Sequence, residues 1–272
     1  MPLQKTEAVI LRTANWSESS RTVVLFSRDF GKITLVDKGG RRFSTKRGRL
    51  VPFARLEITF YASEKSANGY VSETEMLQLY AFEKEGTLGR LAYASAACEL
   101  LNHLLSDQEP QKPLYNLFIA FLELTEDAEK KGLSALFIAF FLRLLSQLGY
   151  HPSLDRCVGC ENDVSREQDG VGNFHFSPER GGFVCDTCQM PGEYYLPLSE
   201  GNARRLVTLQ SSSLPEAASV SIGYKDLNVL LDALTKFMSF QTGVSTSLKS
   251  LGFLEKLKNS NSSTNGMVNE KT

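Results

Sequence analysis

Cys157-Val158-Gly159-Cys160 and Cys185-Asp186-Thr187-Cys188 are separated by twenty-four residues and contain four of the five cysteines of the chain. A Cys-x-x-Cys turn places two thiolates on one side of a tight loop, and two such loops facing each other form a tetrahedral sulfur cage that suits zinc. The stretch therefore predicts a four-cysteine, zinc-ribbon-like module over residues 151–195. Its expected cofactor is one structural Zn²⁺, with these ligands: Cys157, Cys160, Cys185 and Cys188.

Two other uses of the cysteine pairs compete with zinc. Two disulfides are one alternative, but Met1-Pro2-Leu3-Gln4-Lys5 leads directly into a strand-like pattern and not into a signal peptide. A chain of the reducing cytoplasm favours metal over disulfides. Redox catalysis is the other alternative, and neither pair opens a helix after a strand as that chemistry prefers. His175 lies between the pairs, but four thiolates already close a tetrahedron, so no catalytic metal is expected.

The composition places the chain among globular proteins of two or three domains. It has 272 residues, of which 42% are hydrophobic and 22% are charged. The longest apolar zone, residues 133–148, is interrupted by Ser134, Arg143, Ser146 and Gln147 and is too short to cross a membrane. We therefore expect a cytoplasmic protein with no membrane partner.

The net charge of −1 hides an asymmetry along the chain. Residues 1–80 carry 13 Lys and Arg against 8 Asp and Glu, whereas residues 81–272 carry 17 against 23. The front of the chain is thus at +5 and the remainder at −6. A basic front suggests a face that binds polyanions.

The first eighty residues read as five short β-rich segments with turns between them. They cover residues 6–12, 22–27, 32–37, 56–61 and 70–80, and the fourth alternates with the period of two that marks a half-buried strand. Five strands in about eighty residues fit the OB-fold, a small β-barrel, better than a seven-stranded sandwich.

A strongly basic loop joins the third and fourth segments. From Lys38 to Arg49, six of twelve residues are basic, none is acidic, three are glycine and one is Phe43. Positive charges for phosphates beside an aromatic face for a base suit a nucleic-acid backbone better than a merely solvated charge cluster. The glycines do not form a phosphate-binding P-loop. The candidate DNA-binding residues are Lys38, Arg41, Arg42, Lys46, Arg47 and Arg49, with Arg21 and Lys32 as weaker ones.

Trp16 lies in a loop of the same region and has two interpretations. It can stack on a base, or it can pack against the edge of the barrel, as such a residue does more often. The packed position is the one we expect.

From about residue 85 the hydrophobic period becomes helical. Helices are expected over about 85–105, 113–128, 133–148, 199–209 and 227–240, with an amphipathic piece at 248–254 and a Ser- and Ala-rich linker between the last two long helices. Residues 133–148 are apolar nearly all round, which predicts the centre of a bundle. Cys98 falls on an apolar face and is expected to be buried.

These elements predict an α+β multidomain chain. The expected boundaries are an OB-fold at 1–80, a helical bundle in two parts at 81–150 and 196–257, the inserted metal module at 151–195, and a disordered tail at 258–272.

At this level of detail the chain resembles the bacterial recombination mediator family RecO. Glu18-Ser19-Ser20-Arg21 followed by Gly31-Lys32 is similar to the family's first hairpin, and Lys38-Gly39-Gly40-Arg41-Arg42 to its basic loop. Leu148-Gly149-Tyr150-His151-Pro152 and Phe176-Ser177-Pro178-Glu179 are similar to its knuckle region. The resemblance covers about residues 4–257, and it is the order of the motifs that makes it specific.

The resemblance implies a function without bond-breaking chemistry. RecO proteins bind single- and double-stranded DNA, anneal complementary strands, and work with the ring-forming protein RecR. They engage the acidic tail of the single-stranded-DNA-binding protein and so help to load RecA, whose filament is an indirect partner, in recombinational gap repair by the RecF pathway. The resemblance thus implies a nucleoid-associated protein that is not an enzyme. The alternative kept open is a zinc-ribbon RNA-binding or translation-associated protein.

Overall fold

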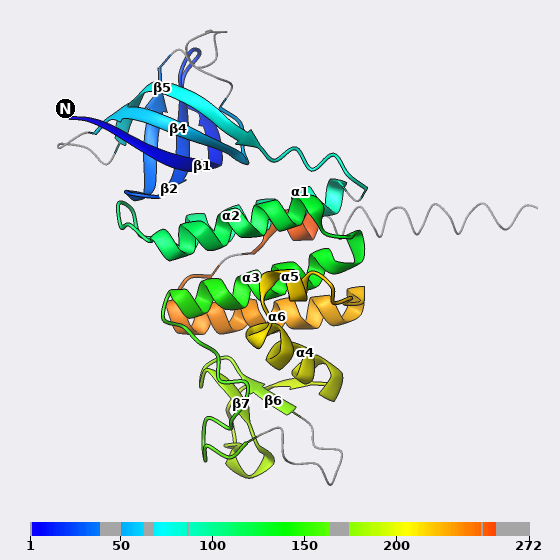
Figure 1. The fold of residues 1–272 in the computed structure, drawn as a ribbon. Helices are drawn as coiled ribbons and strands as arrows, with labels where there is room; N and C mark the ends of the chain where they lie inside the picture. Colours follow the sequence, from blue (N-terminus) through cyan, green and yellow to red (C-terminus); the bar gives the residue numbers. More distant parts are fainter. Residues whose placement is uncertain are drawn as a thin grey trace, which may run out of the picture. The chain divides into compact units, whose positions relative to one another are not determined.

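The computed structural model describes residues 2–38, 50–62, 68–85, 87–163, 174–245 and 247–253, and Figure 1 shows the fold. The chain forms two compact units. The first contains Met1–Asp127 together with Leu248–Thr272, and the second contains Ala128–Ser247. Each unit has its own buried core.

The first unit begins with a closed five-stranded barrel. Its strands are β1 (Leu3–Asn15), β2 (Arg21–Ser27), β3 (Gly31–Asp37), β4 (Ala54–Tyr61) and β5 (Asn68–Leu79). The strands are hydrogen-bonded in the order β1-β2-β3-β5-β4, and β4 closes the barrel on β1. Only the pairing of β3 with β5 is parallel. The barrel has the five strands that the sequence predicted for an OB-fold.

Alternation of apolar and polar residues builds the barrel core. Along β4, the side chains of Ala54, Leu56, Ile58 and Phe60 point inward and are buried, while the residues between them are more exposed. A strand has a side-chain period of two, so this pattern fixes which face of β4 is internal. The remaining core residues come from the other four strands and from Leu50: Ala8, Ile10, Val23, Leu25, Ile33, Leu35 and Val71.

Two helices complete the first unit. They are α1 (Thr87–Leu104) and α2 (Lys112–Asp127), and a helical turn at 249–253 follows much later in the chain. Arg90 of α1 is buried and donates hydrogen bonds to the carbonyls of Thr125 and Glu126 at the end of α2. A cation at a helix C-terminus satisfies free carbonyls and opposes the negative end of the helix dipole. Cys98 is 5% exposed, which confirms its predicted burial.

The second unit is organised around α3 (Leu133–Gln147), in which twelve of fifteen residues are buried. A short 3-10 turn, η1 (Lys130–Gly132), precedes it, and α4 (Glu200–Ser211), α5 (Leu214–Ala217) and α6 (Tyr224–Thr242) pack against it. The prediction that the most apolar segment is central is therefore confirmed within this unit. None of the helices that the structure describes is both long and apolar enough to cross a membrane.

The predicted Ser- and Ala-rich linker was wrong in part, because it contains α5. Ser213 accepts a hydrogen bond from the backbone N–H of Glu216, and the Glu216 side chain accepts one from the backbone N–H of Ser213. This reciprocal capping box starts a helix even in a segment with few apolar residues.

The predicted metal module lies between α3 and α4 and contains a small sheet. A hairpin between the two cysteine pairs is formed by β6 (Phe174–Ser177) and β7 (Gly182–Val184), and the 3-10 turn η3 (Asp186–Cys188) follows it. A third strand, β8 (Leu196–Leu198), pairs with β6 and was not predicted, because three residues are too few to show a period. The predicted tail, 258–272, lies outside the described residues, and the five domain boundaries stay predictions.

Candidate nucleic-acid interface and metal centre

One row of paired residues defines the end of the barrel from which the basic loop leaves. Asn15 of β1 pairs with Arg21 of β2, and Arg21 pairs with Asp37 of β3. Trp16 follows Asn15 and Lys38 follows Asp37 directly in the chain. The β1–β2 turn and the basic loop therefore leave the barrel at the same end.

The Arg21 side chain ties both ends of the basic loop to the barrel. Its Nε donates to the Asp37 carboxylate at 3.0 Å, and its Nη1 donates to the carbonyl of Leu50 at 2.8 Å. The Arg21 and Asp37 side chains are only 15% and 1% exposed. Asp37 ends β3 before the loop and Leu50 follows the loop, so a single guanidinium holds the entry and the exit together.

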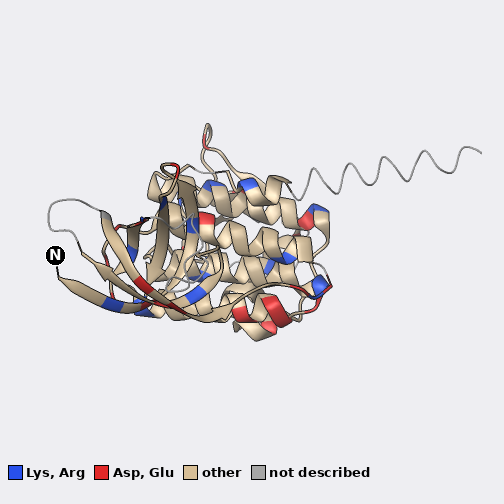
Figure 2. Ribbon diagram, turned by 90° about the horizontal axis from the view of Figure 1, so that it is seen from above, with Lys and Arg blue, Asp and Glu red and all other residues tan. Residues whose placement is uncertain are grey.

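The excess of positive charge in the first eighty residues belongs to this loop. Arg41, Arg42, Lys46, Arg47 and Arg49 lie outside the described residues, as does the pair Glu64 and Lys65. The remainder of residues 1–80 carries seven basic and seven acidic residues, and Figure 2 shows both kinds on the barrel strands. The strands themselves are therefore electrically neutral.

Lys38 is the one strong DNA-binding candidate that the structure describes. It is exposed at the end of β3, and its Nζ lies 3.9 Å from the centre of the Tyr70 ring. A cation over an aromatic face is attracted by the ring quadrupole. The Tyr70 ring thus helps to position the ammonium group of Lys38, the first cation of the basic loop.

The two weaker candidates are held inside the protein. Arg21 is bound to Asp37 and Leu50. Lys32 Nζ lies 2.9 Å from the carbonyl of Asn102 and 3.2 Å from the Asp107 carboxylate, and its side chain is 14% exposed. Both cations therefore bind partners within the first unit, and their contacts with DNA stay predictions.

The expected packing of Trp16 against the barrel edge was wrong. Its side chain is 63% exposed, in the turn between β1 and β2. The turn is closed on itself by hydrogen bonds from the backbone N–H groups of Trp16 and Ser17 to the carbonyl of Ser20. These bonds hold the backbone of the turn, and the indole projects from it into solvent.

The four predicted metal ligands form one cluster. The sulfur atoms of Cys157, Cys160, Cys185 and Cys188 all lie within 4.8 Å of one another. Tetrahedral zinc with Zn–S bonds of about 2.3 Å requires sulfurs about 3.8 Å apart, and the sulfurs of Cys160 and Cys185 are 3.8 Å apart. The donor set therefore fits a tetrahedral metal ion.

The backbone around Cys157 favours its thiolate. Burial alone would raise the pKa of the Cys157 thiol, but hydrogen bonds from the backbone N–H groups of Cys185, Gly159 and Cys160 lower it to about 6. The neighbouring sulfurs of Cys185 and Cys160 raise the pKa of Cys188 to about 12. Four sulfurs this close cannot all ionise without a cation among them, and a divalent metal ion supplies that charge.

Close packing between the two knuckles requires glycine at position 159. A Cβ added there would lie 2.8 Å from Cys188 Cβ and 2.9 Å from a terminal nitrogen of Arg180. The Arg180 guanidinium also donates to the carbonyl of Cys188 at 2.9 Å. The glycine of Cys-Val-Gly-Cys and a distant arginine thus set the distance between the cysteine pairs.

His175, which lies between the cysteine pairs in the sequence, contacts the carboxylate of Asp186. Its Nε2 lies 2.9 Å from the Asp186 carboxylate, and its ring meets Tyr195 edge-on at 6.2 Å between centroids. Among the residues that the structure describes, the metal-ligating cluster contains cysteine only. Through this contact His175 helps to hold the second Cys-x-x-Cys turn, which contains Asp186.

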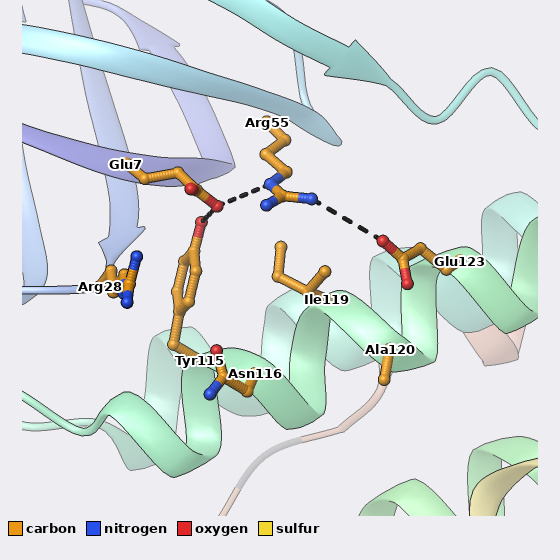
Figure 3. Close-up of a pocket in the computed structure, with 8 residues that line it drawn as sticks. All are labelled: Glu7, Arg28, Arg55, Tyr115, Asn116, Ile119, Ala120 and Glu123. Carbon is orange, nitrogen blue, oxygen red and sulfur yellow. Dashed lines mark hydrogen bonds and ion pairs between the residues drawn. The ribbon is translucent and has the colours of Figure 1, made fainter.

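A polar pocket of about 330 Å³ lies between the barrel and α2, and Figure 3 shows its lining. Arg55 Nε contacts the Glu7 carboxylate at 2.6 Å, and Tyr115 donates to the same oxygen at 2.9 Å. Arg55 also reaches Glu123 at 3.7 Å, and Arg28 completes the charged lining. With two arginines and two glutamates, the pocket has no excess charge for a polyanion, and its ion pairs join α2 to the barrel.

The comparisons with known proteins cover almost the whole chain. The family described as "Recombination protein O N terminal" matches residues 1–80, and "Recombination protein O C terminal" matches residues 85–251. "DNA repair protein RecO" of Symbiobacterium thermophilum is 31% identical over 260 residues, which is 95% of this chain and 99% of the relative. The protein of the same name from Anaeromyxobacter dehalogenans strain 2CP-C is 31% identical over 88% of this chain and 91% of its own. That of Bacillus pumilus is 28% identical over 94% and 95%.

Proposed function

Because the chain belongs to the RecO family of DNA repair proteins, we propose that it is a DNA-binding recombination mediator. In this role it binds single- and double-stranded DNA, anneals complementary strands, and helps to load RecA onto DNA coated with single-stranded-DNA-binding protein. The observation that carries the proposal is that Arg21 joins Asp37 and Leu50, which flank the segment of sequence that contains the excess positive charge of residues 1–80.

The proposed work on DNA is electrostatic and needs neither a nucleophile nor a general base. Two DNA strands repel each other, and annealing requires that their charges be neutralised while their bases stay free to pair. Lys and Arg side chains neutralise phosphates and release the counterions that surround them. Six such contacts to single-stranded DNA give a slope of about −4 for the logarithm of the binding constant against the logarithm of salt concentration.

The proposed contacts come from the basic loop. Lys38, Arg41, Arg42, Lys46, Arg47 and Arg49 supply the charges that neutralise phosphates. Arg21 orients the loop through Asp37 and Leu50 and is a secondary candidate for a contact of its own, as is Lys32.

The four cysteines are proposed to hold one structural Zn²⁺. Thiolates in tetrahedral array select zinc or iron–sulfur chemistry, and two Cys-x-x-Cys knuckles beside a short hairpin are the pattern of zinc ribbons. Four protein ligands leave no open position on the metal, so its role is to hold the knuckles and the sheet of β6, β7 and β8 together.

The proposed protein partners follow from family membership. They are RecR, the C-terminal tail of the single-stranded-DNA-binding protein and, indirectly, the RecA filament. The proposed location is the cytoplasm, in association with the nucleoid.

A charge-reversal variant tests the DNA-binding proposal. Arg41, Arg42, Arg47 and Arg49 are changed to Glu, and a matched control reverses four exposed cations of the second unit: Lys130, Lys131, Arg156 and Arg204. We expect the loop variant to lose affinity for DNA and to fail in strand annealing. The magnitude of its salt slope should decrease from about 4 to about 1, because two contacts remain. The control should keep the wild-type slope.

The same experiment separates the proposal from its alternative. An RNA-binding or translation-associated protein would prefer RNA and would not anneal complementary DNA strands. An unchanged salt slope in the loop variant would show that this loop is not the DNA interface.

A further inference from the structure

We propose that Trp16 is a base-stacking residue that gives the barrel a preference for single-stranded over double-stranded DNA; this inference rests on the DNA-binding function proposed above. Trp16 is the single tryptophan of the chain, and its side chain is 63% exposed. Among the described residues, no other ring or cation contacts its indole. A large apolar ring in this position is available to a ligand.

The turn that carries Trp16 is preorganised. The backbone N–H groups of Trp16 and Ser17 both lie 3.1 Å from the carbonyl oxygen of Ser20, and the N–H of Ser20 donates to the hydroxyl of Ser17 at 3.1 Å. Three hydrogen bonds within five residues fix the backbone from which the indole projects. Little further ordering is then required when a ligand binds, which favours affinity.

The strand register places this turn near Lys38, the first residue of the basic loop. Asn15, Arg21 and Asp37 stand opposite one another on β1, β2 and β3, so Trp16 and Lys38 leave the barrel two strand spacings apart, or about 10 Å. Each strand of B-form DNA rises about 3.4 Å per nucleotide, so about three nucleotides with this spacing bridge that distance. One strand can therefore meet the indole with a base and Lys38 with a phosphate.

The chemistry of stacking explains why the preference is for single strands. Every base has a π-face that an indole can cover, so stacking binds without regard to sequence. In a duplex both faces of an internal base are already covered by neighbouring base pairs. The basic loop neutralises phosphates in either form of DNA, whereas Trp16 acts only on a base that is exposed.

Because Trp16 is the sole tryptophan, its fluorescence reports on its own contacts. The full-length protein is titrated with a fluorescein-labelled dT oligonucleotide, with the same oligonucleotide made abasic, and with a duplex of equal length. Anisotropy of the label measures binding and indole emission measures stacking. The variants are Trp16→Ala and Trp16→Phe, and Phe240→Ala, which removes an exposed ring of α6, is the control.

We expect the dT oligonucleotide to quench the indole at the concentrations at which anisotropy rises, and the abasic oligonucleotide to bind without quenching. Trp16→Ala should weaken binding of the dT oligonucleotide by about 5- to 150-fold, the range of single aromatic stacking contacts. Trp16→Phe should restore most of the affinity. Binding of the abasic strand and of the duplex should change less than about twofold in each of these variants, as should all binding by Phe240→Ala.

The two proposals fail in different ways. Binding of dT without quenching, equal quenching by the abasic strand, or unchanged dT affinity in Trp16→Ala overturns the stacking role alone. The absence of a rise in anisotropy with any DNA overturns the DNA-binding function and the stacking role together.

Discussion

Arg21 donates a hydrogen bond to the carbonyl of Leu50, a residue 29 positions further along the chain. The same guanidinium is paired with Asp37, the last residue of β3. The segment between Asp37 and Leu50 contains the whole basic loop. Arg21, a weaker DNA-binding candidate by sequence, therefore joins the two described residues on either side of the predicted basic loop.

Arg21→Ala should destabilise the first unit. It leaves the Asp37 carboxylate, 1% exposed, without its cation, and breaking a buried ion pair in this way costs about 3 kcal/mol or more. Urea denaturation measures the change in unfolding free energy, with Arg12→Ala on the exposed face of β1 as the control.

The salt dependence of the same variant distinguishes positioning from contact. We expect Arg21→Ala to bind single-stranded DNA more weakly with an unchanged salt slope, since its charge neutralises Asp37. A slope smaller in magnitude by about 0.7 would instead identify Arg21 as a phosphate contact.

Purified protein should contain one zinc per chain, measured by elemental analysis. Strong chelation should remove the metal and increase amide exchange in β6 and β7, while the barrel strands keep their protection because their core is separate. Four free thiols with no zinc in the protein as purified would contradict the metal site, and two disulfides would show that the cysteine pairs are oxidised and hold no metal.

Gly159→Ala should weaken zinc binding by about 10- to 100-fold, as changes next to metal ligands commonly do. The new methyl group would lie 2.8 Å from Cys188 Cβ and would force the knuckles apart. Gly201→Ala is the control, because its nearest neighbour is the end of the Arg205 side chain at 3.5 Å. Competition with a chromophoric chelator measures both affinities, and equal values would show that the knuckles tolerate the methyl group.

Glu7 should stabilise the first unit near neutral pH, and this contribution should be lost in acid. Burial opposes ionisation of Glu7, but hydrogen bonds from Arg55 and Tyr115 lower its pKa below the usual 4.5. A carboxyl group whose pKa is lower in the folded state stabilises above its unfolded pKa, and this contribution is lost as the pH falls through the folded pKa. The advantage of the wild type over Glu7→Gln should therefore be greatest near neutral pH.

Denaturation of both proteins from pH 7 to pH 3 measures that advantage, which should shrink below about pH 4.5. Glu57→Gln is the control on the neighbouring strand, since its pair with Lys5 is exposed and exposed pairs contribute little. A constant difference between wild type and Glu7→Gln over this range would show that Glu7 ionises as it does in the unfolded chain.

Much of the architecture was predicted because it depends on local patterns. The five strands and the long helices follow from the period of apolar residues, which records which face each element buries. The four cysteines that cluster in the structure follow from the spacing within each Cys-x-x-Cys pair. In contrast, α5 was missed because a capping box stabilises its first turn without an apolar stripe, and β8 because three residues show no period.

What the sequence determined alone is the cysteine set, the strand and helix pattern and the concentration of charge in residues 38–49. What only the tertiary structure decided is which side chains are already engaged and which are available. Arg21 and Lys32 resemble other surface cations in the sequence, but residues up to 70 positions away accept their hydrogen bonds. Trp16 is exposed in a turn that the strand register places at the end of the barrel, a position that no local pattern specifies.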